Sequence, residues 1–289
     1  MVTTTVQVPT RVLVFGMARA DGTILAAELM PVAAACGQSA DQVRSCLRRL
    51  VEEGLFARRG RGADAVYEAT AAGLAALAEP MERTRLAYSQ DAAGRGWDRQ
   101  WRLVGFAVPE QNRAARDAFR QRLLALGGAS VQGGLYVSPH PWHKDVRAEA
   151  DRLGLVDALT LVVTDDLEVA GLRDPRELAR RLWRLDEVAR RYQAFIDVFG
   201  GVPDELAALR ARQERLDDTT FLTLALRMAV AFQECFSRDP LLPPELLPRP
   251  WPGRQARELS ANSRRLSRAM RQAKGLPPLF RAYDEVVDG

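Results

Sequence analysis

The sequence predicts an α+β fold of several domains, in which a helix-and-hairpin module comes first, a strand-and-helix module second and long helices last. Three observations carry this prediction. The chain has 289 residues, which suits two or three domains of roughly 100–150 residues each. The pattern of apolar residues changes at Trp97, where a turn and a strand begin, and only helical patterns follow residue 173. We therefore expect domains over residues 1–88, 96–172 and 173–289.

The first two predicted helices cover residues 10–20 and 27–36. The first carries an apolar stripe, and the Asp21-Gly22 pair after it is a turn signal that ends a helix. Residues 24–25 suit a short strand between the two helices. Gly37 ends the second helix.

The third predicted helix begins after Ser39, a residue that favours the N-cap position. Gln42 follows three residues later and completes a capping box. Apolar residues recur along the helix at the spacing of one buried face, and they are Val43, Leu47, Leu50 and Val51. Gly54 ends this helix.

Two short extended segments follow, at residues 55–59 and 66–69, and the glycine-rich residues 60–64 join them into a hairpin. Three helices followed by such a hairpin are the order of elements in a winged helix-turn-helix. We therefore predict a winged helix-turn-helix over residues 1–88, with the third helix as the recognition helix.

The excess positive charge of the chain is concentrated in this module. Residues 44–61 hold six arginines and two glutamates, which accounts for the whole net charge of +4, because the other residues balance at 35 basic and 35 acidic. An exposed helix face can donate hydrogen bonds to base edges in the major groove, and a basic hairpin can reach phosphates. The candidate DNA-binding residues are Ser39, Gln42, Arg44, Ser45, Arg48, Arg49, Arg58, Arg59 and Arg61. Two alternatives stay open: the arginines form a solvated helix face, and the capping box alone explains Gln42.

The central segment predicts strands and helices in the order βαββαβ. The strand that follows Trp97 stops at Pro109, and the remaining elements are expected at 112–126, 129–132, 135–138, 146–153 and 158–164. This order is that of a ferredoxin-like domain.

The last third predicts helices over 176–199, 204–216, 219–236 and 254–274. Between the last two helices, residues 240–252 hold six prolines and five bulky apolar residues. Because the apolar residues are interleaved with the prolines, we expect an ordered turn packed on the domain instead of a flexible linker. The polar, glycine-containing stretch 87–96, before the central domain, suits a hinge.

The composition argues against metal and catalytic sites. The three cysteines are far apart and suit buried apolar positions. The two histidines, His140 and His143, lack carboxylate or thiolate neighbours, and no nucleophile motif such as G-x-S-x-G occurs. No apolar run reaches the length of a membrane helix, and the N-terminus does not resemble a signal peptide. We therefore expect a cytoplasmic, non-enzymatic protein with no membrane partner, no cofactor and no metal.

Several segments together resemble the PaaX-like family, the repressors of bacterial phenylacetic-acid degradation. They are the predicted winged helix, the Trp-rich strand that ends at Val108-Pro109-Glu110, the segment 135–139, the segment 191–195, and the run from Asp239-Pro240 to Trp251-Pro252-Gly253. The resemblance covers nearly the whole chain. It implies a homodimer that binds double-stranded operator DNA and is released by a CoA thioester, phenylacetyl-CoA. It also implies that the central domain is similar to Cas2, a small CRISPR-associated ribonuclease fold.

An acyl-CoA effector needs a site, and the sequence offers candidate residues in its second half: His140, Trp142, His143, Arg176, Arg180 and Tyr192. The aromatic residues equally suit a hydrophobic core. The arginines equally suit a solvated helix face, since Glu177, Asp186 and Glu187 are interspersed as ion-pair partners.

Two other functions remain as alternatives. Some winged helices bind proteins, so the chain could be an interaction adaptor, although the basic third helix favours DNA. A Cas2-like nuclease would need a carboxylate at the end of its first strand to hold a divalent cation. The sequence has Phe106-Ala107-Val108-Pro109 there, so we expect a scaffold for dimerisation or effector sensing instead of a nuclease.

Overall fold

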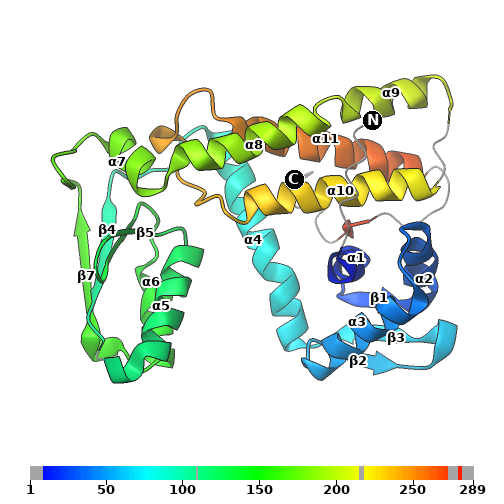
Figure 1. The fold of residues 1–289 in the computed structure, drawn as a ribbon, viewed down its shortest axis with the longest axis horizontal. Coiled ribbons are helices and arrows are strands. Elements are labelled where there is room, and N and C mark those ends of the chain that lie inside the picture. The colour runs from blue at the N-terminus through cyan, green and yellow to red at the C-terminus, as the bar shows by residue number, and fades with distance from the viewer. Residues whose placement is uncertain (1–8, 109, 215–217, 273–278, 282–289) are drawn as a thin grey trace. The chain divides into compact units, whose positions relative to one another are not determined.

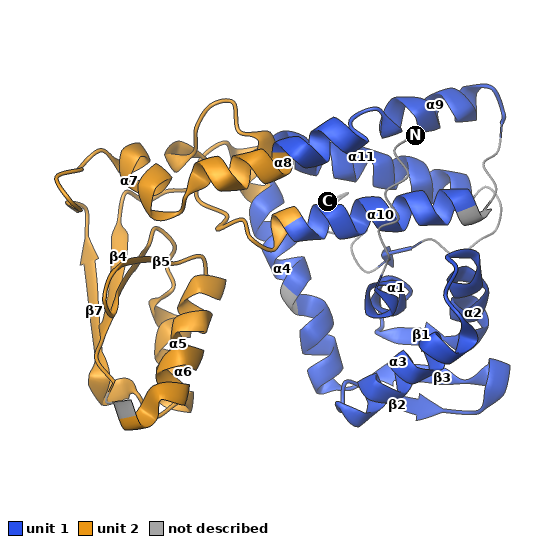
Figure 2. Cartoon of the chain, viewed as in Figure 1, with its two compact units in different colours: residues 1–88, 193–234, 254–289 blue, residues 89–192, 235–253 orange. Residues whose placement is uncertain are grey.

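The computed structural model describes residues 9–108, 110–214, 218–272 and 279–281. The chain divides into two compact units, shown in Figure 2. The first comprises residues 1–88, 193–234 and 254–289, and the second comprises 89–192 and 235–253. The first unit thus joins the N-terminal module to helices from the far end of the sequence. The three domain ranges expected from the sequence stay a prediction.

The N-terminal part of the first unit contains three helices and a small antiparallel sheet (Figure 1). Its elements are α1 (Thr10–Gly16), β1 (Thr23–Leu25), α2 (Ala26–Ala35), α3 (Ala40–Glu52), β2 (Phe56–Arg59), a short 3-10 turn η1 (Gly62–Asp64) and β3 (Val66–Ala69). The strand order is β1-β3-β2, so the hairpin strand β3 is central. Each element lies within a few residues of its predicted position.

Apolar side chains from all three helices and the sheet form one buried core in this module. The members with 2% exposure or less include Leu13, Val14, Met17, Ile24, Leu29, Val43, Leu47, Leu50 and Phe56. Removal of such side chains from water is the main favourable term in folding. The core therefore holds α3 with one face inward and the other in solvent.

The rest of the first unit is helical. It includes α9 (Val202–Ala211), most of α10 (Asp218–Phe236), α11 (Pro252–Gln272) and the second half of α8 (Leu185–Phe199). Aromatic contacts bind α8 to α10, with 5.6 Å between the ring centroids of Phe195 and Phe232. No helix in the described parts of the chain is long and apolar enough to cross a membrane.

The single helix expected over 176–199 is wrong, because the structure divides it into α7 (Pro175–Leu182) and α8. Arg184, between the two helices, has a φ of 49°, which no α-helix accommodates. The adjacent Trp183 is buried, and its indole N–H donates to the backbone oxygen of Gly127 at 2.9 Å. This long-range contact ends the helix although the apolar spacing continues.

The second unit is built on a four-stranded antiparallel sheet with the order β5-β6-β4-β7. Its elements are β4 (Trp101–Phe106), α5 (Arg113–Ala125), β5 (Ala129–Gln132), β6 (Leu135–Ser138), α6 (His143–Arg152) and β7 (Leu159–Thr164). Helices α5 and α6 lie on the same side of the sheet in Figure 1. The predicted βαββαβ order is confirmed, and the two central strands are the first and third of this domain.

Alternate residues of the central strands pack into two different cores, because successive side chains of a strand point to opposite faces of the sheet. Val104 and Tyr136, which are directly paired, pack with Phe119 and Leu123 of α5. Trp101 and Val137 lie on the opposite face, among residues of α7 and of the proline-rich segment. Both faces of the sheet are therefore covered.

The proline-rich segment 238–253 is ordered, as expected. Leu241, Leu242, Leu246 and Leu247 are buried in it, and a 3-10 turn, η4 (Pro244–Leu246), shapes its middle. The Glu245 carboxylate accepts hydrogen bonds from the backbone N–H groups of Gly96 and Trp97, at 3.0 Å and 3.3 Å. These contacts fix the segment on the second unit.

The hinge expected over 87–96 is wrong for residues 87–93, which form the end of a long helix, α4 (Ala71–Ala93). No glycine or proline interrupts the sequence between Pro80 and Gly94, so the small and polar residues continue the helix. Ala87 is buried, and the Tyr88 hydroxyl donates to the backbone oxygen of Arg257 at 3.1 Å. Tertiary contacts therefore stabilise this segment as a helix.

Candidate nucleic-acid interface

The start of α3 is fixed by the predicted capping box, which the structure confirms. The Ser39 hydroxyl accepts from the backbone N–H of Gln42 at 3.2 Å, and the Gln42 side-chain oxygen accepts from the backbone N–H of Ser39 at 2.7 Å. These two bonds satisfy donors that a helix otherwise leaves unpaired at its N-terminus. The side chains of Ser39 and Gln42 thus have a local structural role.

The two faces of α3 differ sharply in character. Val43, Cys46, Leu47 and Leu50 are buried in the core of the module. Arg44, Arg48 and Arg49 are exposed on the other face, with Ser45 half-buried between them. A helix with this division presents several cationic donors to solvent at a fixed spacing.

Carboxylates accompany two of these arginines. Arg44 pairs with Asp41 at 2.6 Å, and Arg48 lies 3.8 Å from Glu52. The four side chains are 62–91% exposed, and ion pairs of this kind contribute about 0–1 kcal/mol. Phosphate groups can therefore displace these partners at little cost.

The β2–β3 hairpin adds three further arginines beside α3. Arg58 and Arg59 lie opposite Tyr67 and Val66 in the ladder, and Arg61 follows at the tip. All three arginines are exposed, and Arg59 pairs with Glu68 at 3.0 Å. Figure 1 shows α3 and the two hairpin strands together at the lower edge of the N-terminal module.

The tip of the hairpin depends on one glycine. Gly60 has a φ of 71°, a conformation that L side chains rarely adopt. A Cβ atom at this position would lie 2.8 Å from the backbone oxygen of Asp64. Gly60 therefore lets the chain turn tightly between Arg59 and Arg61.

The six residues expected to bind an effector all lie in the second unit, but in different surroundings. Trp142 is 2% exposed and belongs to the core under α5 and α6. Tyr192 is fully buried, and its hydroxyl donates to the Asp239 carboxylate at 2.7 Å. Arg176 donates to the backbone oxygen of Glu245 at 2.9 Å, and Arg180 pairs with Asp186 at 3.0 Å. Their role toward an effector stays a prediction.

The two histidines flank Trp142 just before and at the start of α6. The His140 ring nitrogen Nε2 lies 3.3 Å from the backbone oxygen of Pro240. His143 is half-buried, and burial lowers its pKa below the ordinary value of 6.5. His143 is therefore neutral at pH 7.

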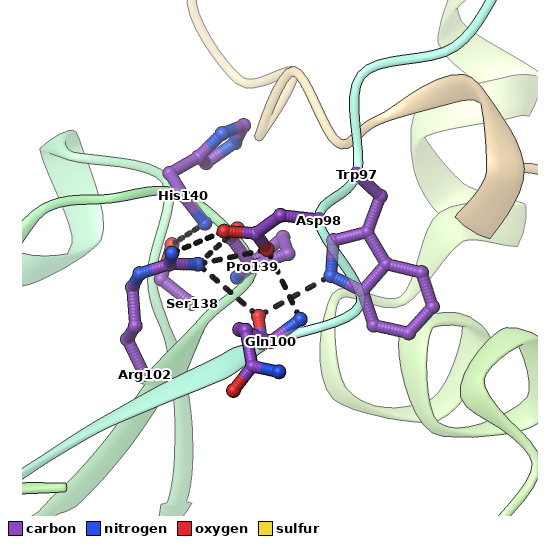
Figure 3. Close-up of polar contacts among 7 residues, drawn as sticks. All are labelled: Trp97, Asp98, Gln100, Arg102, Ser138, Pro139 and His140. Atoms are coloured by element: carbon purple, nitrogen blue, oxygen red, sulfur yellow. Dashed lines mark hydrogen bonds and ion pairs between the residues drawn. The ribbon is translucent and has the colours of Figure 1, made fainter. Parts of the chain in front are cut away.

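A polar cluster, missed by sequence reasoning, joins the start of β4 to the end of β6 (Figure 3). The Arg102 side chain is 13% exposed and forms an ion pair with Asp98. It also donates to the backbone oxygens of Gln100 and Pro139, at 3.3 Å and 3.1 Å. The i, i+4 spacing of Asp98 and Arg102 is the only sign of this cluster in the sequence. The other partners of Arg102 are backbone oxygens, which no residue type marks, and one of them belongs to the distant Pro139.

This cluster predicts a pH-dependent stability. Hydrogen bonds from Arg102 hold the pKa of Asp98 below its ordinary value of 3.8. A carboxyl group with a lowered pKa in the folded state stabilises the fold fully above its unfolded-state pKa. This effect declines below that value and is lost as the pH falls through the folded-state pKa. At pH 6, the variant Asp98→Asn is therefore expected to have a lower melting temperature than the original chain. Thermal denaturation measures this difference. The difference should shrink below pH 4, and an equal difference at both pH values would contradict this role.

Asp239 is a buried acid that sequence reasoning did not identify as a structural residue. It is 3% exposed and accepts hydrogen bonds from the Tyr192 hydroxyl and from the backbone N–H of Leu241, the latter at 2.8 Å. Both partners come from segments that the family resemblance singled out. The hydrogen bond from Tyr192 to Asp239 thus links α8 to the proline-rich segment.

Among the described residues, no group of three or more His, Cys, Asp or Glu side chains is placed to hold a metal ion.

Comparison with known proteins gives matches over most of the chain. Residues 94–179 match the family described as PaaX protein central Cas2-like domain, and residues 183–273 match the PaaX-like protein C-terminal domain. The transcriptional repressor PaaX of Escherichia coli (strain K12) is 25% identical over 222 residues, which cover 76% of this chain and 66% of that repressor. The match thus spans just under two thirds of the length of this curated relative.

A solved structure supports the fold alone. An uncharacterized protein from Mycobacterium tuberculosis superposes with a TM-score of 0.55 at 20% identity, over 86% of this chain and 90% of that one. Together with the matched family descriptions, the fold confirms the expected Cas2-like central domain and the helical C-terminal part.

Proposed function

The chain belongs to the PaaX-like family, and on this premise we propose that it is a non-enzymatic transcriptional repressor that binds operator DNA as a dimer. We also propose that an aromatic acyl-CoA such as phenylacetyl-CoA releases it from the operator. The observation that carries the proposal is the exposed basic surface made by α3 and the β2–β3 hairpin, which we call the basic surface. It comprises Arg44, Arg48, Arg49, Arg58, Arg59 and Arg61.

The N-terminal module acts in this proposal as a winged helix-turn-helix. Three helices precede a two-stranded hairpin, and α3 has a buried apolar face and an exposed basic face. Such a helix fits the major groove with its exposed side chains toward the base edges. The hairpin is then the wing, and its arginines contact phosphates on the adjacent backbone.

The dimer interface that we propose is the free edge of β7. The order β5-β6-β4-β7 leaves β5 and β7 at the edges, and the ladder of β5 is interrupted at Ser130/Gln132 whereas that of β7 is regular. Val162 and Val163 are 45% and 53% exposed there. A long apolar edge strand that carries no charge, proline or bulge pairs readily with another strand. A second copy of β7, antiparallel to the first, meets this requirement and places two basic surfaces in one particle.

The variant Val163→Arg tests this interface. We expect it to be monomeric at concentrations where the original chain is dimeric, because two opposed arginines repel each other across the paired edges. Sedimentation equilibrium measures the mass. The matched control is Val198→Arg, which alters a 63% exposed valine of α8 and should leave the dimer intact. An unchanged mass for Val163→Arg would exclude the β7 edge.

The effector site is proposed at the start of α6. Trp142 Nε1 and His143 Nε2 are buried and have no hydrogen-bond partner among the described residues. Buried polar atoms without a partner are uncommon and call for an explanation such as a bound group. The carbonyl and phosphate oxygens of a CoA thioester can accept from Trp142 Nε1. Its amide N–H groups can donate to Nε2 of the neutral His143 ring, whose other nitrogen donates to the backbone of Leu103. Release from DNA requires that the thioester bind the DNA-incompetent state more tightly than the competent state.

Salt dependence separates DNA binding from the adaptor alternative. For duplex DNA, the logarithm of the affinity falls linearly with the logarithm of salt concentration, with a slope of about −0.9 per phosphate contacted. Fluorescence anisotropy on duplex DNA from the region upstream of the gene should therefore give a slope of several units. Arg59→Ala should reduce this slope by about one. Absence of binding at low salt would reject the proposed function and favour a protein partner for the N-terminal module.

A further inference from the structure

A short segment near the C-terminus, residues 279–281, lies against α1 and α2 within the first unit. The backbone N–H of Phe280 donates to the backbone oxygen of Gly16 at 2.5 Å, and Arg281 donates to that of Met17 at 3.2 Å. Gly16 and Met17 are the last residue and the C-cap of α1. The carbonyls at a helix C-terminus lack partners within the helix, so this segment supplies donors where α1 needs them. We call Phe280 and Arg281 the C-terminal latch.

The ring of Phe280 occupies space that only a glycine leaves free. A Cβ atom on Gly16 would lie 2.8 Å from Phe280 Cε1 and 3.1 Å from Cζ. In protein structures, a Cβ atom essentially never lies as close as 2.8 Å to a heavy atom of such a neighbouring residue. The backbone of Gly16 is helical and does not itself demand glycine. Glycine at position 16 is therefore explained by the space that it leaves for the Phe280 ring.

Arg281 ties α1 to α2. Its guanidinium forms an ion pair with Glu28 of α2 at 2.5 Å while it bonds to the end of α1. Arg19 pairs with the same carboxylate at 2.5 Å. The side chains of Arg281 and Glu28 are only 20% and 23% exposed, so the pair is screened by solvent less than a surface pair.

The latch also contacts the long C-terminal helix. The Arg264 guanidinium, on α11, donates a hydrogen bond to the backbone oxygen of Phe280. Contacts thus run without a gap from α11 through Phe280 and Arg281 to α1 and α2. These two helices pack in turn on α3. The N-terminal module is therefore attached to the helices of its unit at a second place besides its covalent continuation into α4.

We propose that Phe280 and Arg281 are positioning residues that hold the DNA-binding module in the orientation needed to engage two half-sites at once. This inference rests on the proposed function. The latch touches α1 and α2, whereas Arg44 and Arg48 of α3 stay 62% and 69% exposed with the latch in place. The latch therefore leaves the basic surface exposed and does not block DNA from reaching it. A second attachment orders the module before DNA arrives, which reduces the entropy lost when both modules of a dimer bind.

The variant Gly16→Ala removes the seat for Phe280 and leaves the rest of the module unchanged. Alanine favours helix over glycine by about 1 kcal/mol, so α1 itself should not be weakened. Phe280→Ala removes the ring from the other side of the same contact. The matched control is Gly133→Ala, in the β5–β6 turn of the second unit, where an added Cβ meets nothing within 4 Å.

The probe is the duplex that the original chain selects from a random-sequence DNA library, with one half-site scrambled in a second version. We expect Gly16→Ala and Phe280→Ala to lose about tenfold in affinity for the two-half-site duplex, the order expected for loss of pre-organisation. Affinity for the scrambled version should change less than about twofold, because α3 and the hairpin are untouched. The control should match the original chain on both duplexes.

Three results would overturn this inference. Unchanged binding of both variants to the two-half-site duplex would show that the latch does not orient the module. Equal losses on both duplexes would show that it supports the fold of the module instead of its orientation. Failure of the original chain to select any duplex would reject the proposed function itself, and the inference with it, which the first two results would not do.

Discussion

Arg49→Ala is expected to weaken binding to the operator by about 1–3 kcal/mol, or roughly five- to 150-fold, and to relax the preference for one base pair. The side chain is exposed on the face of α3 opposite the buried residues Val43, Leu47 and Leu50. In a major groove this face is the one that meets base edges, and arginine forms two parallel hydrogen bonds with guanine. Competition binding with operator variants, altered one base pair at a time, measures both effects.

Arg59→Ala is the matched control for this prediction. Arg59 lies on the hairpin, where we expect a phosphate contact, so its loss should weaken specific and non-specific DNA binding by the same factor. Neither substitution touches the buried core, and alanine is a good helix former, so the melting temperature should stay unchanged. Equal losses on operator and random DNA for Arg49→Ala would remove this arginine from the base-contacting residues.

Trp101→Ala is expected to lower the free energy of unfolding by about 3–5 kcal/mol, the usual cost of truncating a buried aromatic side chain. Trp101 is 1% exposed and starts β4, the strand that pairs with both β6 and β7. Its ring centroid lies 5.1 Å from that of Trp97 and 6.2 Å from that of Trp183. The substitution therefore opens a cavity where the sheet meets α7 and the proline-rich segment.

Urea denaturation followed by circular dichroism measures this loss. The control is Val198→Ala, which truncates a 63% exposed residue of α8, away from the β7 edge, and should cost less than about 1 kcal/mol. A loss below 1 kcal/mol for Trp101→Ala would show that the three tryptophans do not form a tight core. Because β7 pairs along β4, the proposed dimer should weaken together with the fold.

The elements that sequence reasoning located well are those determined by local signals. Ser39 and Gln42 mark the start of α3 because a capping box involves residues only three apart. The strands of the central sheet were predicted to within a few residues, since each is bounded by glycine, proline or a turn. The βαββαβ order of elements along the chain is confirmed, whereas the order of the strands within the sheet comes from the structure.

The failures arise where distant contacts override local pattern. The break between α7 and α8 depends on Trp183 and its hydrogen bond to Gly127, 56 residues earlier. The seat of Phe280 on Gly16 joins the two ends of the chain and leaves no periodic signal. In the candidate interface, helix geometry places Arg48 and Arg49 opposite the apolar face of the third helix, and both are exposed in the structure. The pairing of Arg59 with Glu68 required the hairpin register.

The most direct test of the central claim is a mobility shift of the purified full chain on DNA from the region upstream of its gene, with and without phenylacetyl-CoA. We predict a discrete shifted complex at low salt that the thioester dissociates and that free CoA does not. A complex that the thioester does not dissociate would support the proposed DNA-binding regulator and contradict the proposed effector. If no complex forms on this DNA or on a selected duplex at low salt, the account of this protein as a DNA-binding repressor is wrong.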